Sequence, residues 1–273
     1  MKLAYLGTPA MAVPPLDALV AAGHEIRTVV TRADARRGRG GRTSPSAVKA
    51  AAERHGIDVT HDVDDVVPLA ERGDVELGVV VAYGRIVRPH VLAALAMVNL
   101  HFSLLPRWRG AAPVERALLA GDEITGVCLM ALEEGLDTGG VYGRVDVPVG
   151  RSTADELRGA LVGAGSELLV DRLHDGFATL GVAEPQRGPV THAAKITPAE
   201  LRIDWSRPAV EIDRLVRLGG AWTTFRGQRV KILAAMLEGQ GVAPTEVQPA
   251  GKPAMSFEAW RNGVRPVPGE WFE

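Results

Sequence analysis

The 273-residue chain is 46% hydrophobic and 23% charged, with a formal net charge of −2, as is typical of a soluble globular protein with one large domain or a domain and a smaller appendage. The near-neutral charge excludes a general attraction to nucleic acid, so any such contact must come from local basic patches. Cys128 is the single cysteine, which excludes an internal disulfide and a cysteine-rich metal site.

The first residues, Met1–Leu6, lead directly into Gly7-Thr8-Pro9 without the basic and then apolar stretch of a secretory signal. No apolar run approaches the roughly 20 residues that span a membrane. We therefore expect a cytoplasmic protein that makes no membrane contact.

Apolar runs that suit strands alternate with patterns that suit helices through the first two thirds of the chain. Strands are predicted at 2–6, 25–30, 77–82, 97–101, 126–130 and 141–147, and helices at 14–22, 46–55, 89–95, 114–120 and 153–174. This alternation predicts a doubly wound α/β domain with a mostly parallel sheet. Ligands of such sheets bind beyond the carboxyl ends of the strands, where the strand order reverses.

The pattern changes at 181–189, where proline, glycine and polar residues predict a linker. We therefore place a catalytic domain at 1–182, a linker at 183–201 and a smaller domain at 202–273. From Leu201 onward the chain has ten basic and eight acidic residues. Short β-like runs there predict a small β-rich unit.

The densest polar cluster of the sequence ends a predicted strand. Asn99 and His101 stand two residues apart, so their side chains share one face of that strand. An amide donor beside an imidazole suits the stabilisation of a developing oxyanion. From these residues alone, a polar strand end with a hydrogen-bonded histidine remains the alternative interpretation.

A second cluster places Asp137 between Gly135 and Gly139, after another predicted strand. The glycines permit a tight loop that presents one carboxylate. The alternative interpretation is an ordinary turn aspartate.

Two segments could contact nucleic acid. In Arg107-Trp108-Arg109, the arginines could bind phosphate and the indole could stack on a base. The stretch 32–49 carries a single acid, Asp34, and predicts a mobile basic loop of the kind that binds phosphate backbones. Its basic residues are Arg32, Arg36, Arg37, Arg39, Arg42 and Lys49. A solvated loop is the alternative for both segments.

Taken together, these segments resemble the folate-dependent formyltransferases, and among them the methionyl-tRNA formyltransferases. The likeness runs over nearly the whole chain, through Gly7-Thr8-Pro9, 79–84, 99–113, 135–139, 202–206 and 248–252. Asn99, His101, Ser103–Pro106 and Asp137 match the core common to these formyltransferases. The continuation to Pro113, the basic loop and the tail motifs match the enzymes that act on tRNA.

The resemblance implies a Rossmann-like catalytic domain followed by an OB-like β-barrel. It implies transfer of the formyl group of 10-formyltetrahydrofolate to the α-amino group of methionine on initiator tRNA, without a metal. Asn99 and His101 would donate hydrogen bonds to the oxyanion, and Asp137 would pair with His101. The folate would be held by Ala82, Tyr83, Gly84, Ser103, Leu104, Leu105 and Pro106.

The resemblance also implies how the tRNA is bound. Arg39 best matches the family's key position in the basic loop, and we expect the protein to act as a monomer. The full set of expected tRNA contacts is Arg36, Arg37, Arg39, Arg42, Arg107, Trp108 and Arg109.

This chain departs from the family pattern in its tail. Between Leu233 and Gln248 the family has several dozen more residues, so we expect a truncated barrel with either open edges or a different closure. The shortened tail keeps a second hypothesis open, namely a formyltransferase for a small amine such as a nucleotide-linked amino sugar. A third hypothesis is a folate- or tRNA-binding protein without catalytic activity.

Overall fold

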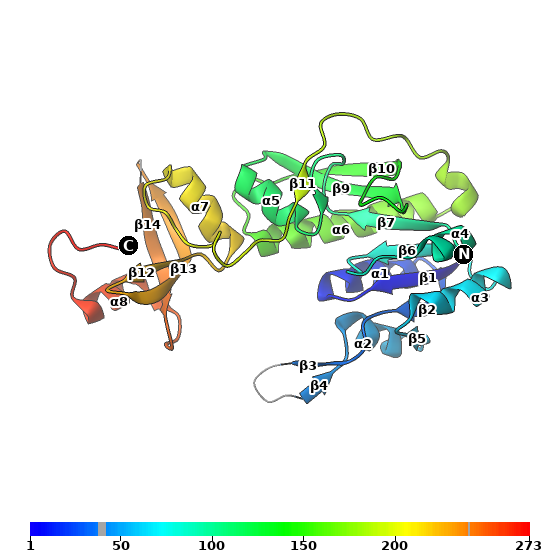
Figure 1. Ribbon diagram of the computed structural model, residues 1–273, viewed down its shortest axis with the longest axis horizontal. Coiled ribbons are helices and arrows are strands. Elements are labelled where there is room, and N and C mark those ends of the chain that lie inside the picture. The colour runs from blue at the N-terminus through cyan, green and yellow to red at the C-terminus, as the bar shows by residue number, and fades with distance from the viewer. Residues whose placement is uncertain (38–41, 240) are drawn as a thin grey trace. The chain divides into compact units, whose positions relative to one another are not determined.

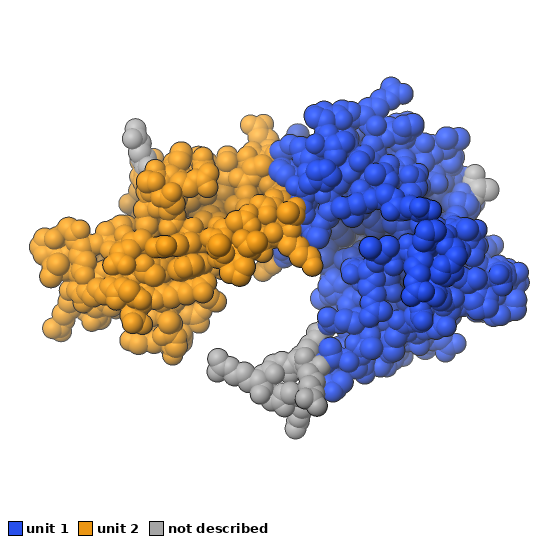
Figure 2. Space-filling view, viewed as in Figure 1, with its two compact units in different colours: residues 1–113, 124–148, 158–193 blue, residues 114–123, 149–157, 194–273 orange. Residues whose placement is uncertain are grey.

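The computed structural model describes residues 1–37, 42–239 and 241–273, and the chain divides into two compact units (Figures 1 and 2). Unit 1 contains residues 1–113, 124–148 and 158–193, and unit 2 contains residues 114–123, 149–157 and 194–273. Unit 2 thus combines two short segments from mid-chain with the C-terminal part. Whether 1–182 and 202–273 fold as separate domains stays a prediction.

A seven-stranded sheet with the order β10-β9-β7-β6-β1-β2-β5 forms the core of unit 1 (Figure 1). The strands from β7 to β5 are parallel, whereas β9 is antiparallel to β7 and β10 is antiparallel to β9. The doubly wound, mostly parallel sheet predicted from the sequence is therefore confirmed. The strands are β1 (Lys2–Gly7), β2 (Glu25–Val30), β5 (Val59–Thr60), β6 (Leu77–Val81), β7 (Met97–His101), β9 (Ile124–Ala131) and β10 (Val141–Pro148).

The strand order of this sheet reverses at β1. The chain passes from β1 to β2 on one side and later places β6 on the other. A doubly wound sheet binds its ligands at this kind of reversal, beyond the carboxyl ends of the strands.

The helical segments of the first 180 residues are η1 (Ala10–Ala12), α1 (Val13–Ala21), α2 (Ala47–Arg54), η2 (Val63–Asp65), α3 (Val66–Glu71), α4 (Pro89–Ala94), α5 (Pro113–Ala120), α6 (Ala154–Leu173) and η3 (Phe177–Leu180). Ser46, the N-cap residue of α2, accepts a hydrogen bond from the Lys49 amide at 2.9 Å. The helix α3 was not predicted from the sequence, because it has only six residues and contains Pro68. Over the described ranges, no helix combines the length and the apolar character needed to cross a membrane.

The predicted basic loop has paired ends. β3 (Ala35–Arg37) and β4 (Arg42–Ser44) form an antiparallel hairpin in which Arg37 lies opposite Arg42. The stretch predicted as a mobile basic loop therefore contains paired backbone on both sides of residues 38–41. Arg39 lies outside the described residues.

Unit 2 is built on an antiparallel sheet with the order β12-β13-β14-β15. Its strands are β12 (Trp222–Phe225), β13 (Gln228–Glu238), β14 (Gly241–Pro249) and β15 (Met255–Ser256), and its C-terminal helices are α7 (Ala209–Leu218) and α8 (Phe257–Val264). Where the family would insert further residues, β13 pairs directly with β14. Within the described ranges β12 and β15 do not pair, so the sheet is open, as expected for a shortened barrel.

Inside unit 2, the buried carboxylate of Asp213 joins α7 to the segment 149–157. It accepts hydrogen bonds from Arg151 Nη2 and Arg217 Nε, both at 2.9 Å. Arg217 also donates to the Ser152 carbonyl oxygen at 2.8 Å. A buried carboxylate is tolerated when its charge is matched in this way.

We expect Asp213→Ala to lower the free energy of unfolding by about 3 kcal/mol, because it leaves the mostly buried Arg217 without its carboxylate. Urea denaturation would measure the loss. The matched control is Arg207→Ala, which breaks the exposed ion pair with Glu211 at the start of α7 and should cost less than about 1 kcal/mol. Equal losses in the two variants would contradict a structural role for the Asp213 network.

Candidate active site

The carboxyl ends of β1, β6 and β7 lie at one edge of the unit 1 sheet, because these strands are parallel neighbours. Gly7 lies opposite Val81 at this edge, and Thr8 Oγ1 donates to the Tyr83 carbonyl oxygen at 3.4 Å. Ala82 has a φ of 47°, in the left-handed region, and the chain turns sharply as it leaves β6. The two segments expected to hold folate, 82–84 and 103–106, thus follow adjacent strands at the same edge.

The segment 103–106 is a tight turn held by its own side chains. Ser103 is fully buried, and its hydroxyl donates to the Arg107 carbonyl oxygen at 2.5 Å. The Arg107 amide donates to the Leu104 carbonyl oxygen at 3.1 Å, and Leu105 is buried. The serine hydroxyl is therefore already used within the turn.

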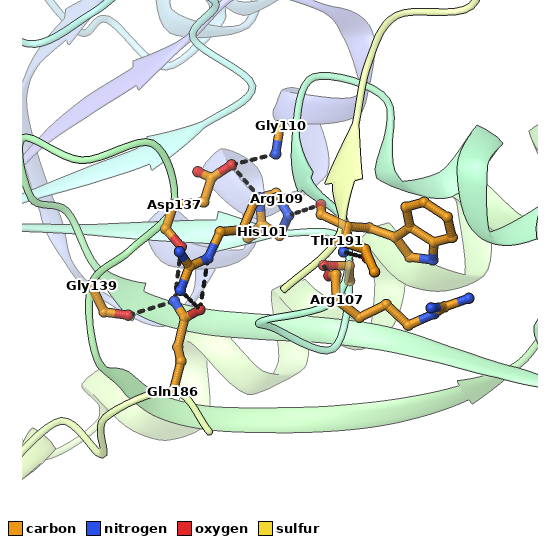
Figure 3. Close-up of polar contacts among 10 residues, drawn as sticks. His101, Arg107, Arg109, Gly110, Asp137, Gly139, Gln186 and Thr191 are labelled. Atoms are coloured by element: carbon orange, nitrogen blue, oxygen red, sulfur yellow. Dashed lines mark hydrogen bonds and ion pairs between the residues drawn. The ribbon is translucent and has the colours of Figure 1, made fainter. Parts of the chain in front are cut away.

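His101, the last residue of β7, is buried and has a partner at each ring nitrogen (Figure 3). Nε2 lies 2.9 Å from the Trp108 carbonyl oxygen. Since a carbonyl oxygen only accepts, Nε2 carries a proton and donates it. Nδ1 faces Asp137 Oδ2 at 3.6 Å, so Nδ1 is the nitrogen that can exchange a proton beside a carboxylate.

The Asp137 carboxylate is fixed by backbone geometry. Asp137 has a φ of 52°, which aspartate tolerates better than most residues. Its Oδ2 accepts a hydrogen bond from the Gly110 amide at 2.7 Å. Gly110 has a φ of 122°, which favours glycine. A Cβ added at Gly139 would collide with the Ala131 carbonyl oxygen. Gly139 is therefore needed because no larger residue fits there.

Asp137 reaches His101 by a route that differs from our expectation. Both polar clusters were predicted at strand ends, which in a parallel sheet would share one edge. Because β9 is antiparallel to β7, its last residue, Ala131, lies opposite Val98. The loop after β9 must therefore fold back along β7 to His101, a span of roughly 10 Å at about 3.3 Å per residue.

Asn99 shares the face of β7 that carries His101. Its side chain is half-buried and has no hydrogen-bond partner among the described residues. Its amide N–H groups are therefore available to a ligand, whereas both nitrogens of His101 already face protein groups.

Cys128 lies directly opposite His101 in the β7–β9 pair and is completely buried. Burial raises the pKa of its thiol. Burial therefore disfavours the reactive thiolate at this position. No group of three or more histidine, cysteine, aspartate or glutamate side chains suited to a metal ion occurs in the described part of the chain.

The expected tRNA contacts differ in their surroundings. Arg107 is exposed, and its guanidinium stacks over the Trp108 ring at 4.4 Å. Arg109 instead turns inward, and its Nε and Nη2 donate to Gln186 Oε1 at 3.1 and 2.6 Å (Figure 3). The structure describes only the backbones of Arg36, Arg37 and Arg42, which lie in the hairpin.

Two residues that contact the site, Gln186 and Thr191, were not predicted from the sequence. Both lie in the stretch assigned to a linker. Gln186 Nε2 donates to the carbonyl oxygens of Asp137 and Gly139, each at 2.8 Å. Thr191 Oγ1 accepts from the Trp108 amide at 2.8 Å. These pairs are distant in sequence, and no local pattern marks them.

Comparison with known proteins agrees with this geometry. Residues 1–173 match the family described as formyl transferase, and residues 195–243 match the formyl transferase C-terminal domain. The methionyl-tRNA formyltransferase of Novosphingobium aromaticivorans is 42% identical over 98% of both chains. That of Dinoroseobacter shibae is 48% identical over 89% of this chain and 85% of the relative.

The chain belongs to the methionyl-tRNA formyltransferase family. The alignment with the Novosphingobium relative is 299 positions long although this chain has 273 residues, so the relative carries residues that this chain lacks. Among solved structures, HypX from Aquifex aeolicus in complex with tetrahydrofolic acid matches the whole chain with a TM-score of 0.67 at 15% identity. This chain covers 50% of HypX, and the likeness concerns the fold.

We expect Gly139→Ala to lower the free energy of unfolding by about 1–3 kcal/mol, because the added methyl group meets the Ala131 carbonyl oxygen. The shifted loop should also release the Gly110 amide from Asp137 and speed its hydrogen exchange. Gly163→Ala in α6, where an added Cβ meets nothing within 4 Å, is the control and should stabilise by about 0.5–1 kcal/mol. Unchanged stability and exchange in Gly139→Ala would refute the packing argument.

Proposed function

We propose that the chain transfers the formyl group of 10-formyltetrahydrofolate to the α-amino group of methionine on initiator tRNA, giving formylmethionyl-tRNA for translation initiation. This is the activity of the family to which the chain belongs. The observation that supports the proposal most strongly is the 3.6 Å distance between His101 Nδ1 and Asp137 Oδ2. The side-chain amide of Asn99, which has no partner among the described residues, lies on the same strand, beside the carboxyl ends of β1 and β6.

In this reaction the amine nitrogen attacks the formyl carbon and forms a tetrahedral oxyanion. The bond between that carbon and the folate nitrogen then breaks. The folate nitrogen receives the proton that the amine releases, so the products are formylmethionyl-tRNA and tetrahydrofolate. The protein has to stabilise the oxyanion and move one proton.

We assign the first oxyanion donor to Asn99, whose amide is free to donate. His101 would be the second donor once the substrate displaces the Trp108 carbonyl oxygen from Nε2. Asp137 would stabilise the positive charge that the imidazole gains on taking up a proton at Nδ1. It would also relay the amine proton, directly or through water. The folate would lie along 82–84 and 103–106 and meet mainly backbone groups.

The tRNA contacts are proposed from exposure and charge. In unit 1 they are the stacked pair Arg107 and Trp108 and the basic residues Arg36, Arg37, Arg39 and Arg42. In unit 2, Arg229 and Lys231 are exposed on one face of the sheet, where they pair across strands with Thr224 and Trp222 of β12. Two exposed basic residues on one face support a tRNA-binding role for 202–273. We further propose that the protein acts as a monomer in the cytoplasm.

Formyl transfer from 10-formyltetrahydrofolate to methionyl initiator tRNA, with methionyl elongator tRNA as the control, tests this function. We expect transfer to the initiator only. The shortened unit 2 favours a second acceptor, a nucleotide-linked amino sugar, which should be assayed beside the tRNA. Transfer to the sugar alone would replace the proposed function, and tight tRNA binding without any transfer would leave a binding protein.

Two substitutions separate the proposed roles. We expect Asn99→Ala to lower kcat by about 10²–10³ through loss of an oxyanion donor. Asp137→Asn should lower kcat by about 10²–10⁴ through loss of proton transfer. Rapid-quench turnover at saturating substrate would measure both, with folate binding by fluorescence as the control for folding. A near-normal kcat in either variant would remove that residue from the mechanism.

A further inference from the structure

Residues 184–193, here called the strap, cross unit 1 beside the site and are anchored at both ends. At one end, Glu184 and Val141 exchange two backbone hydrogen bonds of 2.8 and 2.9 Å. At the other end, β11 (His192–Ala193) pairs in parallel with β8 (Arg109–Gly110). The strap is therefore a fixed part of unit 1, although its composition predicts a linker.

The Gln186 side chain uses its full hydrogen-bonding capacity between two loops. Its two N–H groups go to the carbonyl oxygens of Asp137 and Gly139, and its oxygen accepts two N–H groups of Arg109 (Figure 3). A side-chain amide offers two donors and two acceptor positions. With all four filled, Gln186 connects the Asp137 loop to the segment that carries Gly110.

Thr191 contacts Trp108, the residue whose carbonyl oxygen is the partner of His101 Nε2. Its Oγ1 accepts the Trp108 amide at 2.8 Å, and the carbonyl oxygen of the same Trp108 accepts from His101 Nε2 at 2.9 Å. The strap thus contacts both groups that hold the imidazole, the Asp137 loop through Gln186 and Trp108 through Thr191.

We propose that Gln186 is a positioning residue for the reaction, which fixes the Asp137 carboxylate against His101 by holding the carbonyl groups of residues 137 and 139. This inference rests on the proposed function, since it concerns the rate of formyl transfer. Arg109 belongs to the same arrangement, because its inward guanidinium supports Gln186. This assignment replaces phosphate contact as the role of Arg109.

The reason is geometric. Asp137 lies in a loop without regular secondary structure, and its φ of 52° is less favourable than a right-handed or extended conformation. The Asp137 carbonyl group belongs to the peptide bond that directly follows Asp137, and the Gly139 carbonyl group lies two residues further on. Gln186 therefore fixes the loop on the C-terminal side of Asp137. A displacement of about 1 Å at a reacting group can cost roughly 10² in rate.

Two variants of Gln186 separate its donors from its acceptor. Gln186→Leu removes both. Gln186→Glu keeps an oxygen for Arg109 but loses the N–H groups and brings a carboxylate toward two carbonyl oxygens. If the clamp on the Asp137 loop is what matters, both variants should lower kcat by about 10²-fold, with the KM values for folate and tRNA within about threefold of wild type. A near-normal rate in Gln186→Glu would overturn the assignment to the donors.

A double-mutant cycle tests whether Gln186 acts through Asp137. In the Asp137→Asn background, single-turnover rates should fall by no more than about threefold on adding Gln186→Leu, because the group that it positions is already impaired. A full 10²-fold loss in that background would show an independent action and overturn the proposal. Val190→Ser, an exposed position of the same strap, is the matched control and should keep the wild-type kcat.

A measurement without catalysis distinguishes failure of this proposal from failure of the proposed function. The Gly110 amide, which donates to Asp137 Oδ2, should exchange with solvent at least about tenfold faster in Gln186→Leu than in Val190→Ser. If the wild-type protein formylates no initiator tRNA, the proposed function fails and this exchange still tests the clamp. If the wild-type protein does formylate initiator tRNA, and Gln186→Leu keeps both the wild-type rate and the slow exchange of the Gly110 amide, only the positioning role is overturned.

Discussion

The imidazole of His101 lies between two acceptors: Nε2 donates to the Trp108 carbonyl oxygen at 2.9 Å, and Nδ1 faces the Asp137 carboxylate at 3.6 Å. A ring with one partner can still turn about its side-chain torsions. The bond from Nε2 fixes the position of the proton, and the carboxylate on the opposite side favours one orientation of the ring. Both partners belong to loops, and ordering a loop costs conformational entropy. The site can therefore exist only if the two loops are themselves restrained, and much of the surrounding structure does this.

The topology of the sheet determines how each of these two loops reaches His101. β7 has a parallel neighbour, β6, on one side and an antiparallel neighbour, β9, on the other. The parallel side places the turns after β6 and β7 at one edge. The antiparallel side makes the Asp137 loop start near Val98 and fold back to His101. The long return explains why this loop needs Gly139 where space is lacking and why it is tied to both Gly110 and the strap.

Local patterns predicted six of the seven strands of the sheet and missed the two-residue β5. They also marked Asn99, His101 and Asp137 as candidates, and the family resemblance then favoured a catalytic role over an ordinary structural one. β2 and β7 occupy the residues predicted for them, because buried strands leave continuous apolar runs. Asn99, His101 and Asp137 were found because polar residues at the ends of apolar strands stand out. Their roles in the reaction stay predictions.

Contacts between distant segments could not be predicted in the same way. Gln186 lies 49 residues from Asp137 and 77 from Arg109, and neither separation leaves a periodic signal. The direction of an arginine side chain could not be predicted either. Composition does not reveal that Arg109 turns inward while its neighbour Arg107 faces solvent. The helix α7 did carry a signal, with Pro208 before it and Gly219 after it. It was not predicted, since the short β-like runs of the tail indicated a β-rich unit.

The shortened unit 2 raises the question of how an open sheet avoids pairing with other chains, since an exposed strand edge is a template for aggregation. The outer edge of β12 is covered by other parts of the unit. Trp222 exchanges backbone hydrogen bonds with Leu201 and Ile203 at 2.9 and 2.8 Å, and the Glu273 amide donates to the Thr224 carbonyl oxygen at 2.9 Å. At the other edge, β15 has only two residues and offers little to a partner.

Aromatic packing completes the closure of unit 2. Phe272 stacks on Trp205 and Trp260 with ring centroids 5.4 and 5.1 Å apart, and Phe225 meets Trp260 edge to face at 5.0 Å. The segments that cover β12 are therefore fastened to the same core that supports the sheet. Backbone pairing and ring stacking thus take the place of the missing strands, and the face that carries Arg229 and Lys231 is left open to solvent.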